Sequence, residues 1–266
     1  MDTEIDGLNG FNELGIVTGV DTFTLTGTYA GTYAIVVSQQ DDSVTIIDVS
    51  NPSNIVAADT ETDGFNGFEE LDRPFGVDTF TLTGTYAGTY AIVTAFKDDG
   101  VQIIDVSNPE NIVAKDYLTD TDGAFLELDG AKGVDTFTIG ANTYAIVAAF
   151  NDNGIQILDV SVPSDIYANG YLVDGPSLTL AGASDVDTFT IDGNTYAIVA
   201  AFDDNGVQII DISNPAYPSP AGKLIDSGFT TTLAGASGVD TFTIDGNTYA
   251  IVASVVDNGV QIIDIS

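Results

Sequence analysis

Two acidic segments, at positions 2–13 and 59–70, carry the side chains best suited to chemistry in this chain. Each reads Asp-x-Glu-x-Asp-Gly and has a Glu at its twelfth position. This spacing fits the template of a calcium-binding loop, except for the Glu at position three. The sequence therefore predicts calcium sites with the ligands Asp2, Glu4, Asp6 and Glu13, and Asp59, Glu61, Asp63 and Glu70.

The same acidic residues have a second interpretation if they lie in extended strands. Alternate side chains on one face of a strand stand about 6.7 Å apart. That spacing is too wide to share an ion whose ligands lie at about 2.4 Å. Outward charges also protect an exposed strand edge from pairing with another chain. The sequence leaves calcium binding and edge protection both open.

A third acidic set recurs in the phrase Val-Asp-Thr-Phe-Thr. If this phrase forms the innermost strand of a ring, its carboxylates surround a central channel, where they hold a cation or raise one another's pKa values. Alternatively, each Asp accepts N–H bonds from its own loop. The set consists of Asp21, Asp78, Asp135, Asp187 and Asp240.

The intervals between these Asp residues are 57, 57, 52 and 53 positions. A period of this size indicates stacked supersecondary units, each too small to bury its own apolar face. We expect a single domain over residues 1–266, with repeats that start near positions 19, 76, 133, 185 and 238.

Each repeat has the pattern of a four-stranded sheet. In the fourth repeat, residues 186–191, 195–202 and 207–213 are rich in β-branched and aromatic residues and are separated by Asp-Gly and Asn-Gly turns. More polar fourth strands are expected at 54–60, 111–118, 166–173 and 223–225. No segment shows a helical period. The sequence predicts an all-β fold, a five-bladed β-propeller of four-stranded antiparallel blades.

The two ends of the sequence suggest how such a ring closes. Residues 1–18 align with 59–75, so they begin as a fourth strand, whereas residues 262–266 form a third strand. The N-terminal strand is therefore expected to complete the last blade and remove its free edge. The alternative is that the chain is a piece of a longer array.

The phrase Gly-Val-Gln-Ile-Ile-Asp-[Val/Ile]-Ser-Asn-Pro, at Gly100–Pro109 and Gly206–Pro215, resembles the LVIVD-repeat β-propellers. The resemblance covers all five repeats and implies a propeller fold. It also implies a group that is often associated with cell surfaces and shares no catalytic motif, so no functional residue carries over.

Composition excludes several functions. The net charge of −35 repels nucleic acids and anionic membranes. It suits a halophilic or marine source, although solubility alone also explains it. The absence of His and Cys rules out Ser-His and Cys-His nucleophile pairs and the usual zinc ligands. Calcium is thus the one cofactor expected. The start MDTEIDG is no signal peptide, and no membrane insertion is expected.

The variable loops between blades mix aromatic and charged residues, which suits a protein or glycan ligand, although the aromatic residues could instead cap the core. These loop residues are Phe11, Phe65, Phe68, Glu69, Arg73, Phe125, Glu127 and Phe229.

Symmetric repetition favours a non-enzymatic binding or scaffold propeller. We expect a monomer that acts outside the cell or at its surface, with a cytoplasmic location as the alternative. The alternative function is a carboxylate-based glycosidase or glycan-binding propeller, with Glu70 and Glu127 as the candidate carboxyls. A structural module of a surface layer is the third possibility.

Overall fold

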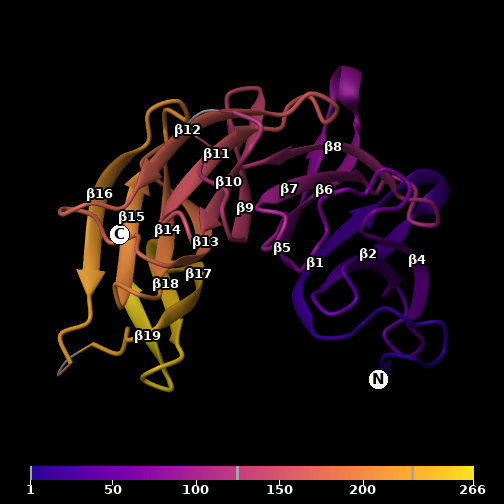
Figure 1. The fold of residues 1–266 in the computed structure, drawn as a ribbon, viewed down its shortest axis with the longest axis horizontal. Helices are drawn as coiled ribbons and strands as arrows, with labels where there is room; N and C mark the ends of the chain where they lie inside the picture. Colours follow the sequence, from indigo (N-terminus) through magenta and orange to yellow (C-terminus); the bar gives the residue numbers. More distant parts are fainter. Residues whose placement is uncertain (1, 124–125, 229–230) are drawn as a thin grey trace. The chain divides into compact units, whose positions relative to one another are not determined.

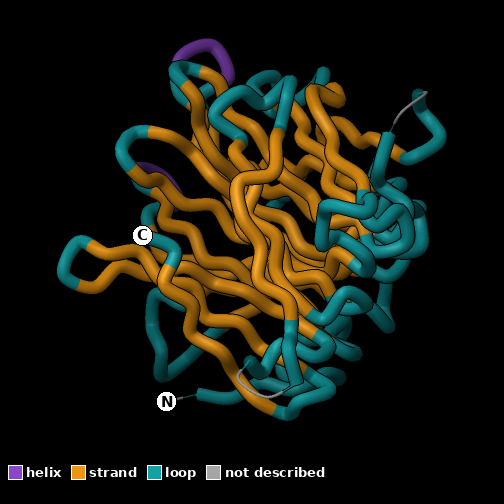
Figure 2. The backbone as a smooth tube through the Cα atoms, turned by 90° about the vertical axis from the view of Figure 1, so that its left-hand side faces the viewer, coloured by secondary structure: helices purple, strands orange, loops and turns teal. Residues whose placement is uncertain are grey.

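The structure is a computed structural model that describes residues 2–123, 126–228 and 231–266. Strands dominate the described chain, and consecutive strands form antiparallel sheets (Figures 1 and 2). The chain divides into two compact units, Met1–Asp122 with Val160–Ile166, and Gly123–Asp159 with Tyr167–Ser266. Among the described residues, no helix is long and apolar enough to cross a membrane.

The first unit contains two four-stranded sheets whose strands pair in chain order. Sheet 1 consists of β1 (Val17–Leu25), β2 (Gly31–Ser38), β3 (Ser43–Asp48) and β4 (Val56–Thr62). Sheet 2 consists of β5 (Pro74–Leu82), β6 (Gly88–Ala95), β7 (Gly100–Asp105) and β8 (Val113–Thr119). Single 3₁₀ turns at Gly27–Tyr29 and Gly84–Tyr86 join the first two strands of each sheet.

The second unit contains three sheets. Sheet 3 consists of β9 (Ala131–Ile139), β10 (Asn142–Ala149), β11 (Gly154–Asp159) and β12 (Tyr167–Val173). Sheet 4 consists of β13 (Ala183–Ile191), β14 (Asn194–Ala201), β15 (Gly206–Asp211) and β16 (Ser219–Ile225). Sheet 5 has three strands in the described chain, β17 (Ala236–Ile244), β18 (Asn247–Ser254) and β19 (Gly259–Asp264).

Local sequence explains the repeated hairpins. The turns between the second and third strands place Asp or Asn at positive φ, the left-handed region that these two residues tolerate best. The residues concerned are Asp42, Asp99, Asn153, Asn205 and Asn258. In the first hairpin of every repeat, a Phe stacks on the Tyr opposite it, with ring centroids 5.5 to 5.7 Å apart. Such cross-strand aromatic pairs fix the register of the two strands.

Apolar residues of neighbouring sheets form the cores of each unit. In the first unit, Val44 and Ile46 of sheet 1 share a core cluster with Ala91 and Val93 of sheet 2. In the second unit, Ile155 of sheet 3 clusters with Val199 of sheet 4. In sheets 1 to 4 the second and third strands are mostly buried on both faces, as their nearly continuous apolar sequences predict.

The predicted all-β architecture and its antiparallel repeats are confirmed, including a last sheet in which the chain contributes three strands. The predicted fourth strands are shifted by up to four residues at their starts. The expected N-terminal strand is not formed in the described part of residues 1–16, where the chain makes turns and an isolated bridge between Leu8 and Phe11.

Candidate active site

A buried carboxyl, that of Glu70, lies in the loop between β4 and β5. Its neighbours anchor this loop: Phe68 is 1% exposed and Leu71 is fully buried. The backbone N–H of Glu69 donates to Oε1 of the buried Gln102 on β7 (3.2 Å). Glu70 itself is 8% exposed. The loop therefore holds this carboxyl in place from both sides.

Glu70 faces the start of β7, where Gly100 leaves room for it. A Cβ atom on Gly100 would lie 3.0 Å from Glu70 Oε2. This oxygen is buried and has no hydrogen-bond partner in the described chain. A buried carboxyl without a partner resists ionisation, because nothing replaces the water that its charge would lose.

The negative charges around the loop also disfavour ionisation of Glu70. Burial, followed by the negative charges of Asp98, Asp63 and Asp122, raises the pKa of Glu70 to about 8. Glu70 is therefore protonated at neutral pH and can donate a proton. In the first repeat, Glu13 holds the position equivalent to Glu70. Burial and the charges of Asp41 and Asp6 also raise the pKa of Glu13.

Asp98, in the turn between β6 and β7, differs in its environment. Its Oδ2 accepts a hydrogen bond from the backbone N–H of Asp72 (2.7 Å). Burial raises the pKa of Asp98 to about 6, against the lowering effect of that hydrogen bond. At neutral pH Asp98 is thus mostly ionised while Glu70 is protonated. Two neighbouring carboxyls whose pKa values are separated in this way can divide the roles of base and acid.

A second group of ionisable residues lies in the second unit and was missed by the sequence analysis. Asp185, at the start of β13, accepts a hydrogen bond from Val239 N (2.9 Å), and burial raises its pKa to about 6. Lys132 on β9 lies over the ring of Phe150, 4.3 Å from its centroid, and burial lowers its pKa. The sequence contained a signal for this group, because Asp185 occupies a position at which the other four repeats have Gly.

Six of the eight predicted calcium ligands, all except Glu13 and Glu70, accept hydrogen bonds from donors of the chain itself. Asp59 Oδ2 accepts from Ile112 N (2.7 Å), Glu61 Oε2 from Asn66 Nδ2 (2.8 Å) and Asp63 Oδ1 from Leu71 N (3.0 Å). The same pattern recurs at the N-terminus, where Asp2, Glu4 and Asp6 accept from Ile55 N, Asn9 Nδ2 and Leu14 N. Over the described residues, no three acidic groups are close enough to hold a metal ion. Calcium binding stays a prediction.

Three of the five Asp residues in the predicted ring, Asp21, Asp135 and Asp187, join neighbouring sheets within a unit. Asp135 Oδ2 accepts from the backbone and hydroxyl of Thr188 (2.8 and 2.6 Å), and Asp187 Oδ2 accepts from Thr241 N (2.6 Å). Asp21 bonds Thr79 in the same way. These partners belong to the next repeat rather than to each residue's own loop. Cation binding by the set is still a prediction.

The aromatic and charged residues predicted to bind a ligand in the variable loops have different environments. Phe11 and Phe68 are each 1% exposed and fill the core, whereas Phe65 is 67% exposed. The guanidinium of Arg73 lies 5.4 Å from the centroid of the Phe96 ring. The backbone N–H of Glu127 donates to Gln156 Oε1 (3.2 Å). Phe125 and Phe229 lie outside the described residues.

The chain belongs to the LVIVD repeat family, whose pattern matches residues 29–60, 86–119, 142–170 and 184–224. The resemblance noted from the sequence is thereby confirmed. No curated protein matches the chain.

Solved structures share the fold at low sequence identity. A functionally unknown protein from Desulfotomaculum acetoxidans is 12% identical, with a TM-score of 0.56 over 92% of this chain and 68% of the other. The periplasmic gluconolactonase of Pseudomonas aeruginosa is 13% identical, with a TM-score of 0.61 over 88% and 63%. A Bacteroides uniformis protein provisionally assigned as a 6-phosphogluconolactonase is 13% identical, with a TM-score of 0.62 over 88% and 64%. The chain thus spans about two thirds of the length of these propeller-like proteins.

These neighbours correct the functional expectation. The prediction of a non-enzymatic binding or scaffold propeller is wrong on this comparison, because the structures that share the fold include proteins named as lactonases. The alternative, a carboxylate-based glycosidase or glycan-binding propeller, is closer to these neighbours. The non-enzymatic prediction relied on the symmetry of the repeats. That symmetry does not extend to the environments of Glu70, whose buried oxygen has no partner, and of Asp185, whose pKa is raised by burial.

Proposed function

We propose that this protein is a carboxylate-dependent hydrolase of a sugar-derived substrate, in which Glu70 donates a proton and Asp98 accepts one. The observation that carries the proposal is the buried Oε2 of Glu70, which lacks a partner and belongs to a carboxyl that stays protonated up to a pH of about 8. Asp98, with a pKa of about 6, supplies the neighbouring base.

Opening of a sugar lactone is the reaction that we favour. Asp98 takes a proton from water as the water oxygen attacks the carbonyl carbon. The bond between that carbon and the ring oxygen breaks, and Glu70 protonates the ring oxygen. The product is a hydroxy acid, and a proton that returns from Asp98 to Glu70 through solvent restores both groups. General acid and base catalysis of this kind contributes about 100-fold to 10,000-fold.

The negative charge of the chain limits the choice of substrate. With a net charge of −35 and five Lys and Arg residues in total, the protein repels anions. A neutral sugar lactone therefore suits it better than a phosphorylated one.

The proposal is tested by following acid release in a pH-stat at pH 6.5 to 7 with glucono-δ-lactone, its 6-phosphate and a panel of nitrophenyl glycosides. We expect turnover of the neutral lactone above the spontaneous rate, and a loss of about 100-fold in kcat for Glu70→Gln. The control Glu110→Gln makes the same change at an exposed position and should retain full activity. Hydrolysis of glycosides alone would redirect the proposal to glycosidase chemistry. No turnover, or equal rates for Glu70→Gln and wild type, would exclude Glu70 as the acid.

We further propose that the five sheets close into a ring in which residues 2–5 supply the fourth strand of sheet 5. Two observations support this. Asp2 Oδ2 accepts from Ile55 N (3.0 Å), just as Asp59 of β4 accepts from Ile112 N (2.7 Å). The N-terminal segment thus lies against sheet 1 as a preceding fourth strand would. In addition, Val260 and Ile262 of β19 are 64% and 56% exposed, although their equivalents in the other sheets are buried or half-buried.

A further inference from the structure

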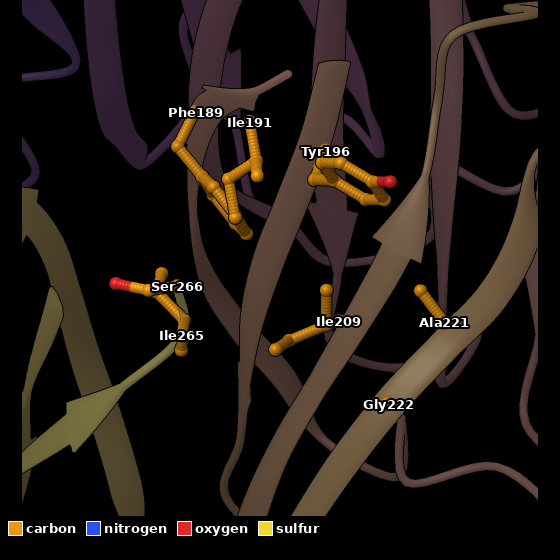
Figure 3. A pocket seen from close by; sticks show the side chains of 8 residues that line it. All are labelled: Phe189, Ile191, Tyr196, Ile209, Ala221, Gly222, Ile265 and Ser266. Atoms are coloured by element: carbon orange, nitrogen blue, oxygen red, sulfur yellow. The ribbon is translucent and has the colours of Figure 1, made fainter. Parts of the chain in front are cut away.

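The fourth strand of sheets 1 to 4 carries one bulged residue that the pairing register skips. In sheet 1 the register of β3 and β4 skips Ala58, and in sheet 2 the register of β7 and β8 skips Lys115. Ala221 holds this position in sheet 4, where Figure 3 shows it with Tyr196 among the residues that line a hollow. A β-bulge re-aims the side chain that it carries. Ala58 and Lys115 are therefore equivalent residues with very different side chains.

In sheet 2, Lys115 uses the bulge to place its ammonium group against a carboxylate. Its Nζ lies 3.0 Å from Oδ2 of Asp105, the last residue of β7, and both side chains are partly buried. The other oxygen of this carboxylate, Oδ1, accepts a hydrogen bond from Ser107 N (3.1 Å). Burial and the charge of Asp105 raise the pKa of Tyr90 on β6, and the charge of Lys115 opposes them. The ammonium group thus lies near both Asp105 and the phenol opposite it.

Sheet 1 has the same carboxylate without the ammonium group. Asp48 ends β3, and its Oδ1 accepts from Ser50 N (2.9 Å), just as Asp105 accepts from Ser107 in sheet 2. No ion pair joins Asp48 to a Lys or Arg of the described chain. The residue opposite it on β2, Tyr33, has a pKa that is raised by burial and by the charges of Asp48 and Glu110. Oδ2 of Asp48 is therefore the oxygen to which a cation would bind.

Beside Asp48 lies a hollow of about 370 Å³. It is lined by Tyr33, Asp48, Val56, Ala57, Ala58 and Glu110. The side chains from β4 offer an apolar surface to a chain of methylene groups, while Asp48 supplies the negative charge. The hollow can therefore hold a ligand that is apolar along its length and cationic at one end.

Glu110, in the linker between β7 and β8, is exposed and is not required for such a pair. Ser164 holds the equivalent position in the next linker, because Ile166 N donates to Asp116 as Ile112 N donates to Asp59. The ion pair of sheet 2 thus forms without a carboxylate at that position.

We propose that this hollow binds a primary alkylammonium group, with the ammonium on Oδ2 of Asp48 and the methylene chain against β4. The ligand class follows from sheet 2, where the side chain of Lys115, itself an alkylammonium group, binds the equivalent carboxylate. The net charge of −35 raises the concentration of cations around the protein. The group is supplied by a free amine or by a Lys side chain of a partner protein. The site does not depend on the proposed hydrolase.

The first test titrates n-butylamine hydrochloride into the full ¹⁵N-labelled chain at pH 7, with NaCl adjusted to keep the ionic strength constant. We expect saturable chemical-shift changes at the amides of Ser50, Ala57 and Ala58. Tetramethylammonium has the same charge but no N–H donor, so it should bind at least tenfold more weakly. An absence of saturable shifts at millimolar amine, or equal affinity for the two cations, would overturn the proposal.

The same titration distinguishes the two sources of the ammonium group. One arm uses 1,5-diaminopentane, and the other uses lysine that is acetylated at its amino group and amidated at its carboxyl group. Binding of the diamine alone would support a free amine as the ligand. Binding of the capped lysine would support a Lys side chain of a partner. Binding of neither would contradict the proposal.

The second test removes the charge. Asp48→Asn keeps an oxygen that can accept from Ser50 and should weaken binding of n-butylamine at least tenfold. The matched control Glu110→Gln removes the same charge at the exposed mouth of the hollow. It should change affinity less than threefold, because salt screens an exposed charge. Equal losses in the two variants would show attraction by the negative surface as a whole and would overturn the proposal.

The third test supplies the ammonium group from the chain itself. Ala58→Lys reproduces the arrangement of Lys115 in sheet 2 and should abolish binding of n-butylamine. Ser219→Lys adds the same side chain at an exposed position of β16 and should bind the amine as wild type does. Unchanged binding by Ala58→Lys would contradict the site. If that variant fails to fold, the comparison of n-butylamine with tetramethylammonium on the wild-type chain still decides the question.

Discussion

Asp21 and Thr79 are joined by two hydrogen bonds across neighbouring sheets. Oδ2 of Asp21 accepts from the backbone N–H of Thr79 (2.9 Å) and from its hydroxyl (2.5 Å). The two residues stand 58 positions apart, on β1 and β5. One carboxylate oxygen therefore joins the first strand of one repeat to the first strand of the next.

Removal of the two hydrogen bonds between Asp21 and Thr79 should weaken the contact between sheets 1 and 2. We expect Asp21→Ala to lower the free energy of unfolding by about 1–3 kcal/mol, because Thr79 loses a charged acceptor for two donors. Urea denaturation measures the change. A double-mutant cycle with Thr79→Val should show coupling, whereas Glu110→Ala, at an exposed position, should have little effect. Additive effects of the two substitutions would show that the bond contributes nothing to stability.

Glu70 should make the protein less stable as pH rises. Its pKa in the folded chain, about 8, lies above the ordinary value of 4.5. The folded state thus holds the proton more tightly than the unfolded state. The stability that the neutral form contributes is fully present below a pH of about 4.5 and is lost as pH rises through about 8. Asp98 and Asp185, with pKa values of about 6, add losses of the same sign at lower pH.

The measurement is the free energy of unfolding from pH 4 to pH 9 for wild type and Glu70→Gln. The wild-type curve should fall over this range, and the curve of the variant should be flatter above pH 6. Parallel curves would mean that Glu70 titrates normally in the folded protein.

Ring closure can be tested with disulfides, because the chain has no Cys of its own. β3 pairs Val44 with Glu61, so the matching positions in the proposed closing pair are Val260 and Glu4. We expect Glu4→Cys with Val260→Cys to form an intramolecular disulfide on mild oxidation, seen as faster migration in non-reducing gels. Either single variant serves as the control. Disulfide-linked dimers or free thiols in the double variant would argue against closure within one chain.

The pKa of Lys132 should respond to Asp185. Burial lowers this pKa, and the charge of Asp185 partly opposes that effect. Asp185→Asn removes the charge while its side-chain oxygen can still accept from Val239, so the pKa of Lys132 should fall further. Titration of the Lys132 side chain by NMR measures it. Lys97, exposed and paired with Asp72 in the first unit, is the internal reference and should not change.

The repeat made the fold predictable, and particular residues show why. Strand-forming residues and Asp-Gly or Asn-Gly turns recur five times, so each repeat supports the same prediction. The first strands extend further than expected toward their N-terminal ends. In the fourth repeat β13 starts at Ala183, three residues before the predicted Val186. Pairing with β14 through an irregularity between Ala183 and Asp185 supplies the missing partners, and sequence pattern alone does not reveal it.

The candidate site was only partly predictable. Glu70 stood out because of its spacing from Asp59, but the role inferred from that spacing was calcium binding. Its buried oxygen without a partner lies close to Gly100, which is 30 positions away at the start of β7. The hydrogen-bonding role of Asp21 in the predicted Asp ring was not predictable either, because its partner Thr79 belongs to the next repeat. Contacts between repeats are the part of the chemistry that local pattern leaves unspecified.

The buried glutamines on the third strands have a consequence for how such chains diversify. Gln102, Gln156 and Gln208 each accept a hydrogen bond from the loop that leads into their own sheet, and each donates to a carbonyl of the fourth strand. The anchor uses only the loop's backbone, so almost any side chain can occupy the anchored position, as Glu69, Glu127 and Thr179 illustrate. Loops can therefore be exchanged between repeats, in evolution or by design, while the sheets beneath them keep their register.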